Sequence, residues 1–188
     1  MTTPPLRLNA VFARAPTLRD ATDDDRPFLL ALYASTRADE LARTGWSAET
    51  RQVFVQMQYA AQHADYLRRH PDSRCQVIES GDVPVGRLWF ARDGHSLHVL
   101  DISLIPALRG QGLGGACLRR VLDEAGLDGL DVCLHVAVGN PARRLYERLG
   151  FIAAGLPGLH QAMTWTPLPG ARRPALTNDS WEMRHEQA

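Results

Sequence analysis

The chain has 188 residues, of which 45% are hydrophobic and 22% are charged, and its 21 basic residues balance 21 acidic ones. This composition is typical of one globular domain, and the zero net charge disfavours a nucleic-acid-binding protein, which usually carries a basic excess. All 21 basic residues are arginines, so the sequence excludes enzymes that need a P-loop, kinase or Schiff-base lysine.

Cysteine usage and hydropathy indicate the compartment. Cys75, Cys117 and Cys133 are widely spaced, and the chain has neither a CxxC pair nor an HExxH motif. We therefore predict free thiols in a reducing environment and no metal site. The sequence shows no signal-peptide pattern and no apolar run near the ~18 residues of a membrane span. We expect a cytoplasmic protein with neither a membrane nor a nucleic acid as partner.

The two ends differ from the middle of the chain. Residues 1–16 contain three prolines, and residues 167–188 form a proline-containing polar tail. We expect both segments to be loosely structured. Residues 17–166 show no linker or repeat, which predicts one domain.

Helical signals come first in chain order. Asp23, Asp24 and Asp25 can cap a helix whose apolar residues begin at Phe28. Ser47 can cap a second, longer helix, which ends before Pro71. In that helix, one apolar stripe is formed by Val53, Met57, Ala60, Ala61, Ala64 and Leu67.

The spacing of the apolar residues then changes from that of a helix to that of a strand. Residues 75–78, 83–90 and 97–105 are predicted strands, joined by turns at Gly81-Asp82 and Asp93-Gly94. A helix over 112–124, a strand over 132–136 and a helix over 141–148 follow. The region around Phe151 and the stretch 161–165 complete the sheet. This order predicts a mixed α/β domain.

A glycine-rich loop follows the third predicted strand, with Gly110, Gly112, Gly114 and Gly115 before a helix. Such a loop lets backbone N–H groups approach an anion, and the helix dipole adds attraction. The spacing also satisfies the dinucleotide fingerprint G-x-G-x-x-G, but that motif should open a fold, and this loop follows about a hundred residues. A glycine turn without a ligand is a further alternative.

The pattern Arg109-x-x-Gly112-x-Gly114 resembles the acyl-CoA pyrophosphate loop of the GNAT N-acetyltransferase superfamily. The resemblance continues in the run from Asn140 through Leu145-Tyr146 to Gly150-Phe151. It covers about residues 17–166. It implies a GNAT acyl-CoA acyltransferase fold, in which helices flank a mixed, mostly antiparallel sheet with a splayed strand pair. It also implies direct transfer of acetyl from acetyl-CoA, the co-substrate, to an amine acceptor.

The resemblance assigns the cofactor-binding positions. The backbone of Leu104 and Ile105 would pair with the pantetheine arm, with the Leu104 N–H pointing at the thioester oxygen. Asn140 would bind the pantetheine or cap the helix that begins at Pro141, and Arg143 would lie near the 3′-phosphate or on a solvated face. The pyrophosphate would be bound by backbone amides of Arg109, Gly110, Gln111, Gly112, Leu113 and Gly114.

Two side chains carry the expected proton transfers. Tyr146 can protonate the departing thiolate, and its alternative role is to pack beside Phe151. Asp101 is the candidate base or amine contact, because alternation along its strand would otherwise favour an apolar residue there. Its alternative is a carboxylate satisfied by backbone or arginine partners. His95 and His98 are the other candidate bases.

Two other functions remain open from the sequence: a non-catalytic CoA-binding sensor on the same fold, and a dinucleotide-binding oxidoreductase. The acceptor is not readable, although Tyr33, Glu40 and Trp46 in the N-terminal helices are expected to contact it. The chain is expected to be a monomer or a homodimer.

Overall fold

The computed structural model describes residues 15–156 and 158–168, so most of both predicted loose ends lies outside the described residues. The described chain alternates helices and strands much as the sequence predicts. In order, the elements are β1 (Thr17–Asp20), η1 (Asp23–Asp25), α2 (Arg26–Ala42), α3 (Ala48–Arg69), β2 (Arg74–Ser80), β3 (Val83–Arg92), β4 (Ser96–Leu104), η2 (Pro106–Leu108), α4 (Leu113–Asp128), β5 (Asp131–Ala137), α5 (Arg143–Arg148), β6 (Ile152–Ala154) and β7 (His160–Trp165).

The seven described strands form one sheet in the order β1-β2-β3-β4-β5-β7-β6. Every neighbouring pair is antiparallel except β4–β5, which is parallel. The predicted mixed, mostly antiparallel sheet is therefore confirmed. A Rossmann-type sheet is parallel, so this topology removes the structural context that the dinucleotide interpretation requires.

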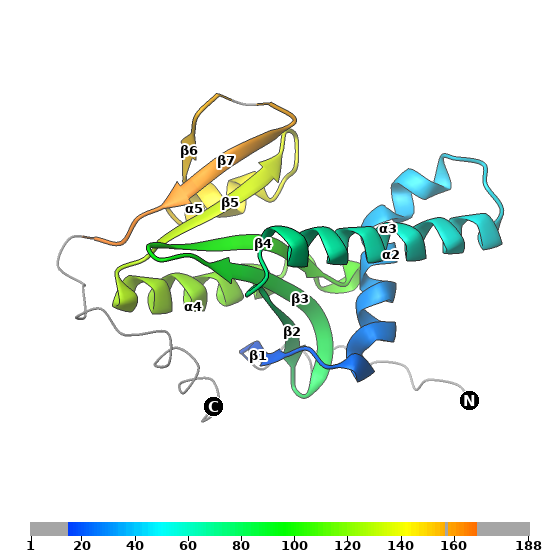
Figure 1. Ribbon diagram of the computed structural model, residues 1–188, viewed down its shortest axis with the longest axis horizontal. Coiled ribbons are helices and arrows are strands. Elements are labelled where there is room, and N and C mark those ends of the chain that lie inside the picture. The colour runs from blue at the N-terminus through cyan, green and yellow to red at the C-terminus, as the bar shows by residue number, and fades with distance from the viewer. Residues whose placement is uncertain (1–14, 157, 169–188) are drawn as a thin grey trace.

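The parallel pair separates partway along its length. β4 pairs with β5 only from Ser96↔Asp131 to Val99↔Leu134. Beyond Val99, β4 continues to Leu104 alongside β3, while β5 continues alongside β7. In Figure 1, β5 and β7 turn away from the β1–β4 half of the sheet. The expected splayed strand pair is thus present, and it leaves one edge of β4 unpaired.

Two apolar clusters cover the two faces of the sheet. The larger includes Leu118 and Val121 of α4 and Tyr146 of α5, packed against strand residues such as Leu88 and Val132. The smaller joins α2 and α3, through residues such as Leu29, Tyr33, Val55 and Tyr59. Helices therefore flank the sheet on both sides.

The long helix α3 buries a different face from its apolar stripe. Val55 and Tyr59 are buried against the sheet side, whereas Val53 is 65% and Met57 58% exposed. Ala60, Ala61, Ala64 and Leu67 lie on the less buried part of the helix as well. An apolar stripe of this kind usually faces the core. Here it faces outward.

The close approach of β3 and β4 requires a glycine. A Cβ at Gly86 would overlap the Ser103 carbonyl oxygen and lie 2.6 Å from Leu104 Cδ2. A side chain at this position must displace the last residues of β4.

We predict that Gly86→Ala lowers the free energy of unfolding by about 1–3 kcal/mol, because an added methyl in a packed region forces backbone shifts. Chemical denaturation would measure it. Gly94→Ala, at a turn position with no atom within 4 Å of its added Cβ, is the matched control. Equal stability of the two variants would contradict the described packing of β3 on β4.

Candidate active site

The unpaired edge of β4 presents the backbone of Leu104. The Ile105 N–H donates to the Val85 carbonyl on β3, 2.9 Å away. Because backbone groups alternate in direction along a strand, the N–H and C=O of Leu104 point to the opposite edge, where β5 has separated. The Leu104 carbonyl there accepts a hydrogen bond from Arg109 Nε at 2.9 Å. This is the edge at which an extended ligand can add as a strand.

Ile105 is placed differently from Leu104. Its N–H is bonded to Val85, and its carbonyl accepts from the Leu108 N–H at 3.0 Å. Both backbone groups are thus used within the chain, and the pairing with pantetheine expected for two residues is open only to Leu104.

The glycine loop connects this edge to α4. Gly110 and Gly112 have φ of +74° and +87°, in the left-handed region that other residues rarely adopt. The Ala116 N–H donates to the Gly112 carbonyl at 2.9 Å, so the earlier N–H groups of α4, those of Leu113 and Gly114 included, have no partner inside the helix. Together with the helix dipole, these N–H groups have the geometry to bind an anion at the helix N-terminus.

The loop's two longer side chains fold back on the backbone. Gln111 Nε2 donates to the Ala107 carbonyl at 2.7 Å. Arg109 reaches Leu104, and its Nη2 lies 3.5 Å from Ser35 Oγ on α2. The Arg109 N–H donates to Pro106 at 3.2 Å. The Arg109 side chain therefore lies at the open edge, on the Leu104 carbonyl, whereas Gln111 folds back on the loop itself.

A β-bulge determines where Asp101 points. The β3–β4 register shifts between Phe90↔Val99 and Trp89↔Asp101, so Leu100 is an extra residue. Without the bulge, Asp101 would share the face of buried Val99. The bulge turns Asp101 to the α3 face, beside Trp89, which explains an acidic residue at a position where alternation predicts an apolar one.

Asp101 is held by a buried arginine. Its Oδ2 accepts hydrogen bonds from Arg87 Nε at 2.9 Å and from Ser103 Oγ at 2.7 Å, and Arg87 Nη2 lies 2.8 Å from the same oxygen. Arg87 Nη2 also donates to Gln62 Oε1 of α3 at 3.0 Å. The Arg87 side chain is only 2% exposed. Among the described residues nothing hydrogen-bonds Asp101 Oδ1, so one carboxylate oxygen is available to a ligand.

Sequence reasoning did not find Arg87 or Gln62. An arginine within the apolar run Val83–Phe90 was a usable signal, because a buried arginine requires a partner charge. The alternative interpretation, that Asp101 pairs with an arginine, is confirmed by the Arg87–Asp101 ion pair. The same carboxylate is 23% exposed, so pairing with Arg87 and contact with a ligand are compatible.

Tyr146 enters the same region from α5. Its ring is buried and lies edge-on to Phe151, with centroids 5.8 Å apart. Burial raises the pKa of its phenol to about 12, and the negative charge of Asp101 acts in the same direction. Tyr146 is therefore protonated at neutral pH. The fold brings the charge of Asp101 within electrostatic reach of a hydroxyl that lies far along the chain.

The remaining residues with expected roles at CoA have local partners. Asn140 Oδ1 accepts from the Ala142 N–H at 2.9 Å in the turn before α5, and α5 begins at Arg143 with Ala142 as its N-cap and no side-chain cap. Arg143 Nε bonds Glu147 Oε1 at 2.8 Å on the surface of α5. Both side chains are exposed.

The other candidate bases and nucleophiles are less suitably placed. His95 is exposed at the β3–β4 turn, and His98 Nε2 lies 2.6 Å from Asp93 Oδ2 near the same end of β4. His98 is about 20 Å from Leu104 along an extended strand. Burial raises the pKa of the thiols of Cys75 and Cys117 to about 11, which disfavours the thiolate that a covalent route would need.

The residues expected to contact the acceptor lie in or just after α2. Tyr33 is buried and packs on Tyr59 of α3, with ring centroids 5.7 Å apart. Glu40 is exposed and pairs with Arg37 at 3.3 Å. Trp46 is 41% exposed and lies edge-on to Phe54.

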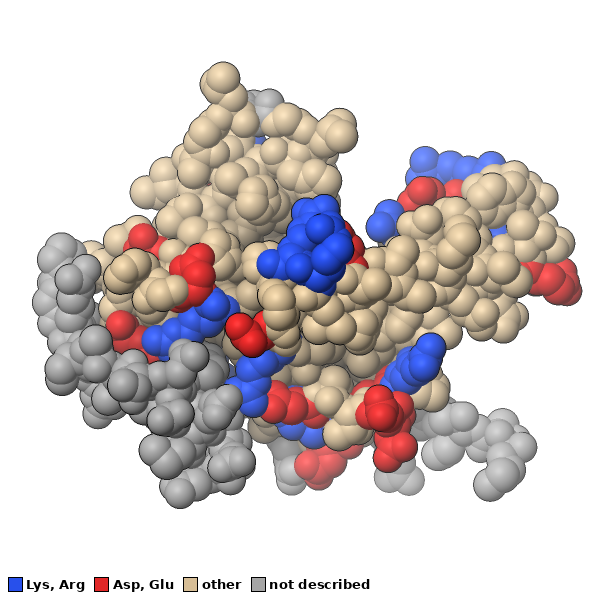
Figure 2. All heavy atoms as spheres, viewed as in Figure 1, with Lys and Arg blue, Asp and Glu red and all other residues tan. Residues whose placement is uncertain are grey.

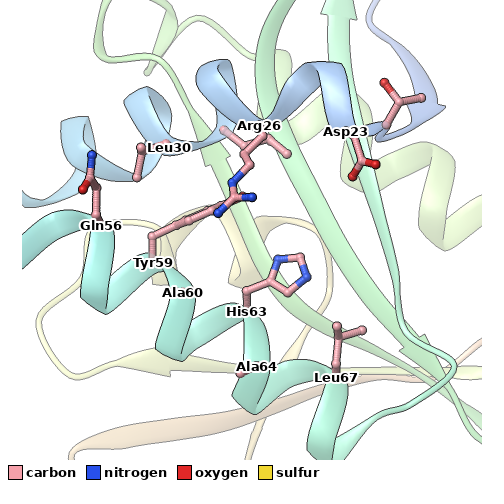
Figure 3. A pocket seen from close by; sticks show the side chains of 11 residues that line it. Asp23, Arg26, Leu30, Gln56, Tyr59, Ala60, His63, Ala64 and Leu67 are labelled. Atoms are coloured by element: carbon pink, nitrogen blue, oxygen red, sulfur yellow. The ribbon is translucent and has the colours of Figure 1, made fainter.

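A separate groove of about 670 Å³ lies between α2 and α3. Figure 3 shows Arg26, Tyr59 and His63 along this groove. Burial, followed by the positive charges of Arg87 and Arg26, lowers the pKa of His63. The loop residues, Leu104 and Tyr146 do not line it, so the groove is distinct from the open edge of β4.

Neither a metal cluster nor a membrane helix is found in residues 15–156 and 158–168. No group of three or more His, Cys, Asp or Glu side chains there is arranged to hold a metal ion. None of the helices in that part of the chain is long and apolar enough to cross a membrane.

Comparison with known proteins identifies the family. Residues 36–151 match the model of the acetyltransferase (GNAT) family. That match spans more than half of the chain and includes both sequence motifs. The protein belongs to the GNAT acetyltransferase family. No curated protein matches the sequence.

Solved structures share the fold at low sequence identity. The PaiA N-acetyltransferase of Thermoplasma acidophilum, in complex with coenzyme A, has a TM-score of 0.62 and 14% identity, over 81% of this chain and 99% of that one. An acetyltransferase from Thermus thermophilus has a TM-score of 0.58 and 22% identity, over 81% and 97%. The YncA protein of Salmonella typhimurium, with its cofactor acetyl-CoA, has a TM-score of 0.53 and 23% identity, over 87% and 100%.

The geometry gives a direct test of the loop. A Cβ at Gly114 would lie 3.7 Å from Leu104 Cδ1 and 4.0 Å from Leu145 Cδ2, between the end of β4 and α5. We predict that Gly114→Val folds normally and loses at least about tenfold in coenzyme A affinity by calorimetry, because the added methyl groups fill the space beside the open edge.

Gly94→Val is the control for that substitution, because nothing lies within 4 Å of its added Cβ. It should bind coenzyme A as the wild type does. Unchanged affinity in a folded Gly114→Val protein would rule out this loop as the binding site.

Proposed function

We propose that residues 17–166 form an N-acetyltransferase domain that moves the acetyl group of acetyl-CoA directly to an amine. The proposal is supported by the unpaired edge of β4 beyond Val99 and by the electrostatic effect of Asp101 on Tyr146. Leu104 and Asp101 belong to β4, and Tyr146 belongs to α5. Membership of the family supports the reaction class. The sensor alternative is distinguished by turnover.

In this proposal the open edge and the loop bind acetyl-CoA. The extended pantetheine arm pairs with Leu104, and the pyrophosphate lies against the free N–H groups at the start of α4. Arg109 must then release the Leu104 carbonyl, which it now contacts. Coenzyme A and acetyl-CoA in the solved structures of similar fold support this cofactor.

Asp101 receives the proton that the amine loses. Its Oδ1 faces no hydrogen-bond donor among the described residues, whereas Oδ2 is held by Arg87 and Ser103. The fixed oxygen orients the carboxylate, and the other contacts the amine directly or through one water. Arg87 is a positioning residue in this arrangement, because it acts on the substrate only through Asp101.

The bonds made and broken then balance. The neutral amine nitrogen attacks the thioester carbon, whose oxygen takes up the electron pair and is stabilised by the Leu104 N–H. Such a fixed donor is worth on the order of 3 kcal/mol. As the C–S bond breaks, the sulfur accepts a hydrogen bond and then the proton of Tyr146, and the resulting phenolate takes up the proton that the acylated nitrogen loses. Asp101 releases to solvent the proton that it took from the ammonium form of the amine. The products are the acetylated amine and coenzyme A thiol.

The Tyr146 phenol is a weak acid for protonating the departing thiolate. This sets the order in which the protons are transferred. A pKa of about 12 exceeds that of a thiol near ~8.5 by several units, so full transfer before C–S cleavage is unfavourable. Protonation of Asp101 by the amine removes one of the two causes that raise the Tyr146 pKa. Uptake of the amine proton therefore makes Tyr146 a stronger acid when the thiolate leaves.

Turnover is tested by incubating the protein with acetyl-CoA and pools of amines, while free thiol and product mass are followed. The chain contains no lysine, so any acetyl-lysine formed in a mixture with proteins comes from the acceptor. We expect thiol release that depends on an acceptor and a product heavier by one acetyl group. Binding of acetyl-CoA without turnover across small amines, peptides and proteins would favour the sensor.

We predict that Tyr146→Phe lowers kcat by about 10²- to 10⁴-fold at pH 7, the usual value of a positioned acid, with coenzyme A affinity nearly unchanged. The ring still packs on Phe151. The deficit should narrow above the thiol pKa of about 8.5, where the thiolate leaves without a proton. A variant within about threefold of wild type at pH 7, with chemistry limiting, would exclude Tyr146 as the acid.

We predict that Asp101→Asn lowers kcat/KM at neutral pH, and that the loss shrinks as pH rises through the pKa of the acceptor amine. A neutral amine no longer needs a proton acceptor, so only the base function is relieved by high pH. Asp93→Asn, in the turn between β3 and β4, is the control. A loss of kcat/KM that is the same at every pH would indicate that Asp101 acts only as the ion-pair partner of Arg87.

A further inference from the structure

The groove between α2 and α3 takes part in no step of the proposed reaction. Its volume of about 670 Å³ lies in the usual range of small-ligand sites. Leu104, Asp101 and Tyr146 do not line it. The residues of α3 that contact the surroundings of Asp101 are Gln62 and Tyr66, and neither of them lines the groove. The groove is therefore a second place at which a small molecule can bind, separate from the open edge of β4.

Both charged residues that line the groove lie on its α2 wall. Asp23 belongs to η1, and Arg26 begins α2 three residues later. Side chains at this spacing lie on the same side of a helical turn. Figure 3 shows both side chains directed from this wall toward α3, and Figure 2 shows basic and acidic atoms next to one another where α2 begins. One wall thus presents a positive and a negative charge to the same space.

These two opposite charges are left unpaired. Within residues 15–156 and 158–168, neither the Asp23 nor the Arg26 side chain forms an ion pair or a hydrogen bond. The nearby Asp25 differs, because Arg19 Nη1 lies 2.7 Å from its Oδ2. A guanidinium forms its strongest hydrogen bonds with a carboxylate. Both charges of the groove therefore remain available to a ligand.

The opposite wall of the groove is neutral. Between Arg51 and Asp65, α3 has no Asp, Glu, Lys or Arg. The residues that it contributes to the groove are Gln56, Tyr59, Ala60, His63, Ala64 and Leu67. Burial, followed by the positive charges of Arg87 and Arg26, lowers the pKa of His63, so its imidazole is neutral at pH 7. This wall offers apolar surface and uncharged polar groups to a ligand.

We infer that the groove binds a zwitterionic α-amino acid with an apolar side chain. Arg26 binds the α-carboxylate and Asp23 binds the α-ammonium group, while the side chain of the ligand lies against Ala60, Ala64 and Leu67. An α-amino acid carries both charges on one carbon, so it can bridge two side chains that do not pair directly. A carboxylate without an ammonium group would meet the charge of Asp23, and an amine without a carboxylate would meet that of Arg26.

Calorimetry with L-leucine, in the absence of acetyl-CoA, tests the inferred ligand class. We expect the wild type to bind L-leucine with a Kd below about 1 mM. Two analogues each remove one charge: 4-methylpentanoate lacks the ammonium group, and 3-methylbutylamine lacks the carboxylate. Both should bind at least about tenfold more weakly, because each loses hydrogen bonds between charged groups. Equal affinity for either analogue, or a Kd above about 10 mM for both L-leucine and L-phenylalanine, would overturn the inference.

Variants of the α2 wall test the location of the ligand. Arg26→Gln should abolish binding of both L-leucine and 4-methylpentanoate. Asp23→Asn should weaken L-leucine at least about tenfold but not 4-methylpentanoate, because only the ammonium group loses its partner. Asp24→Asn and Arg43→Gln are the matched controls: both residues are exposed and lie outside the groove, and their variants should bind L-leucine as the wild type does.

Circular dichroism should be unchanged in all four variants. Tyr146→Phe should also keep the affinity for L-leucine, so the inferred site does not depend on the proposed acetyl transfer. L-leucine bound at the open edge of β4 would be indifferent to Arg26→Gln. An affinity that survives Arg26→Gln, or that falls equally in Asp23→Asn and Asp24→Asn, would show that the groove is not the site.

Discussion

The site depends on the early end of the one parallel strand pairing. β4 and β5 are paired only through Val99↔Leu134, so the last residues of β4 are bonded on one side alone. Had the pairing continued, the Leu104 N–H would have been used by β5 and the sheet would have no place for an added extended ligand. The glycine loop and the start of α4 follow directly from this free end. The open strand edge and the proposed anion site are thus consecutive in the chain.

A second constraint is the bulge on β4. The extra residue Leu100 shifts the face on which its successors lie, and it frees a carbonyl that Tyr66 contacts from α3. Asp101 and Ser103 therefore point into the α3 side, where Arg87 is buried. Removal of Asp101 would leave the buried Arg87 without a partner charge, which is destabilising. In the proposed mechanism the same carboxylate also acts as the base, because only its Oδ2 is bonded to Arg87 and Ser103.

Much of the fold and of the candidate site follows from local sequence patterns. The spacing of apolar residues, the capping residues and the turn glycines predict the helices and strands. The loop from Arg109 to Gly114 is recognisable because only glycines readily permit its positive φ values. Contacts between residues that lie apart in the sequence could not be predicted. The Arg87–Asp101 pair depends on a bulge and on register, and neither leaves a signature in single-residue propensity. The bond from Arg109 to Leu104 depends on how a long side chain folds back. The outward stripe of α3 has a pattern identical to that of a core-facing helix, because periodicity identifies an apolar face but not its partner.

The central claim is that the Leu104 N–H is the donor that the acyl group of acetyl-CoA meets. Amide hydrogen exchange at single-residue resolution tests it most directly, with Ile105 as an internal reference because its N–H is bonded to Val85. The account predicts that the Leu104 amide exchanges rapidly in the free protein and becomes protected when acetyl-CoA binds, while Ile105 is protected in both states. A Leu104 amide that is equally protected with and without acetyl-CoA, or that stays unprotected in the saturated complex, would contradict it.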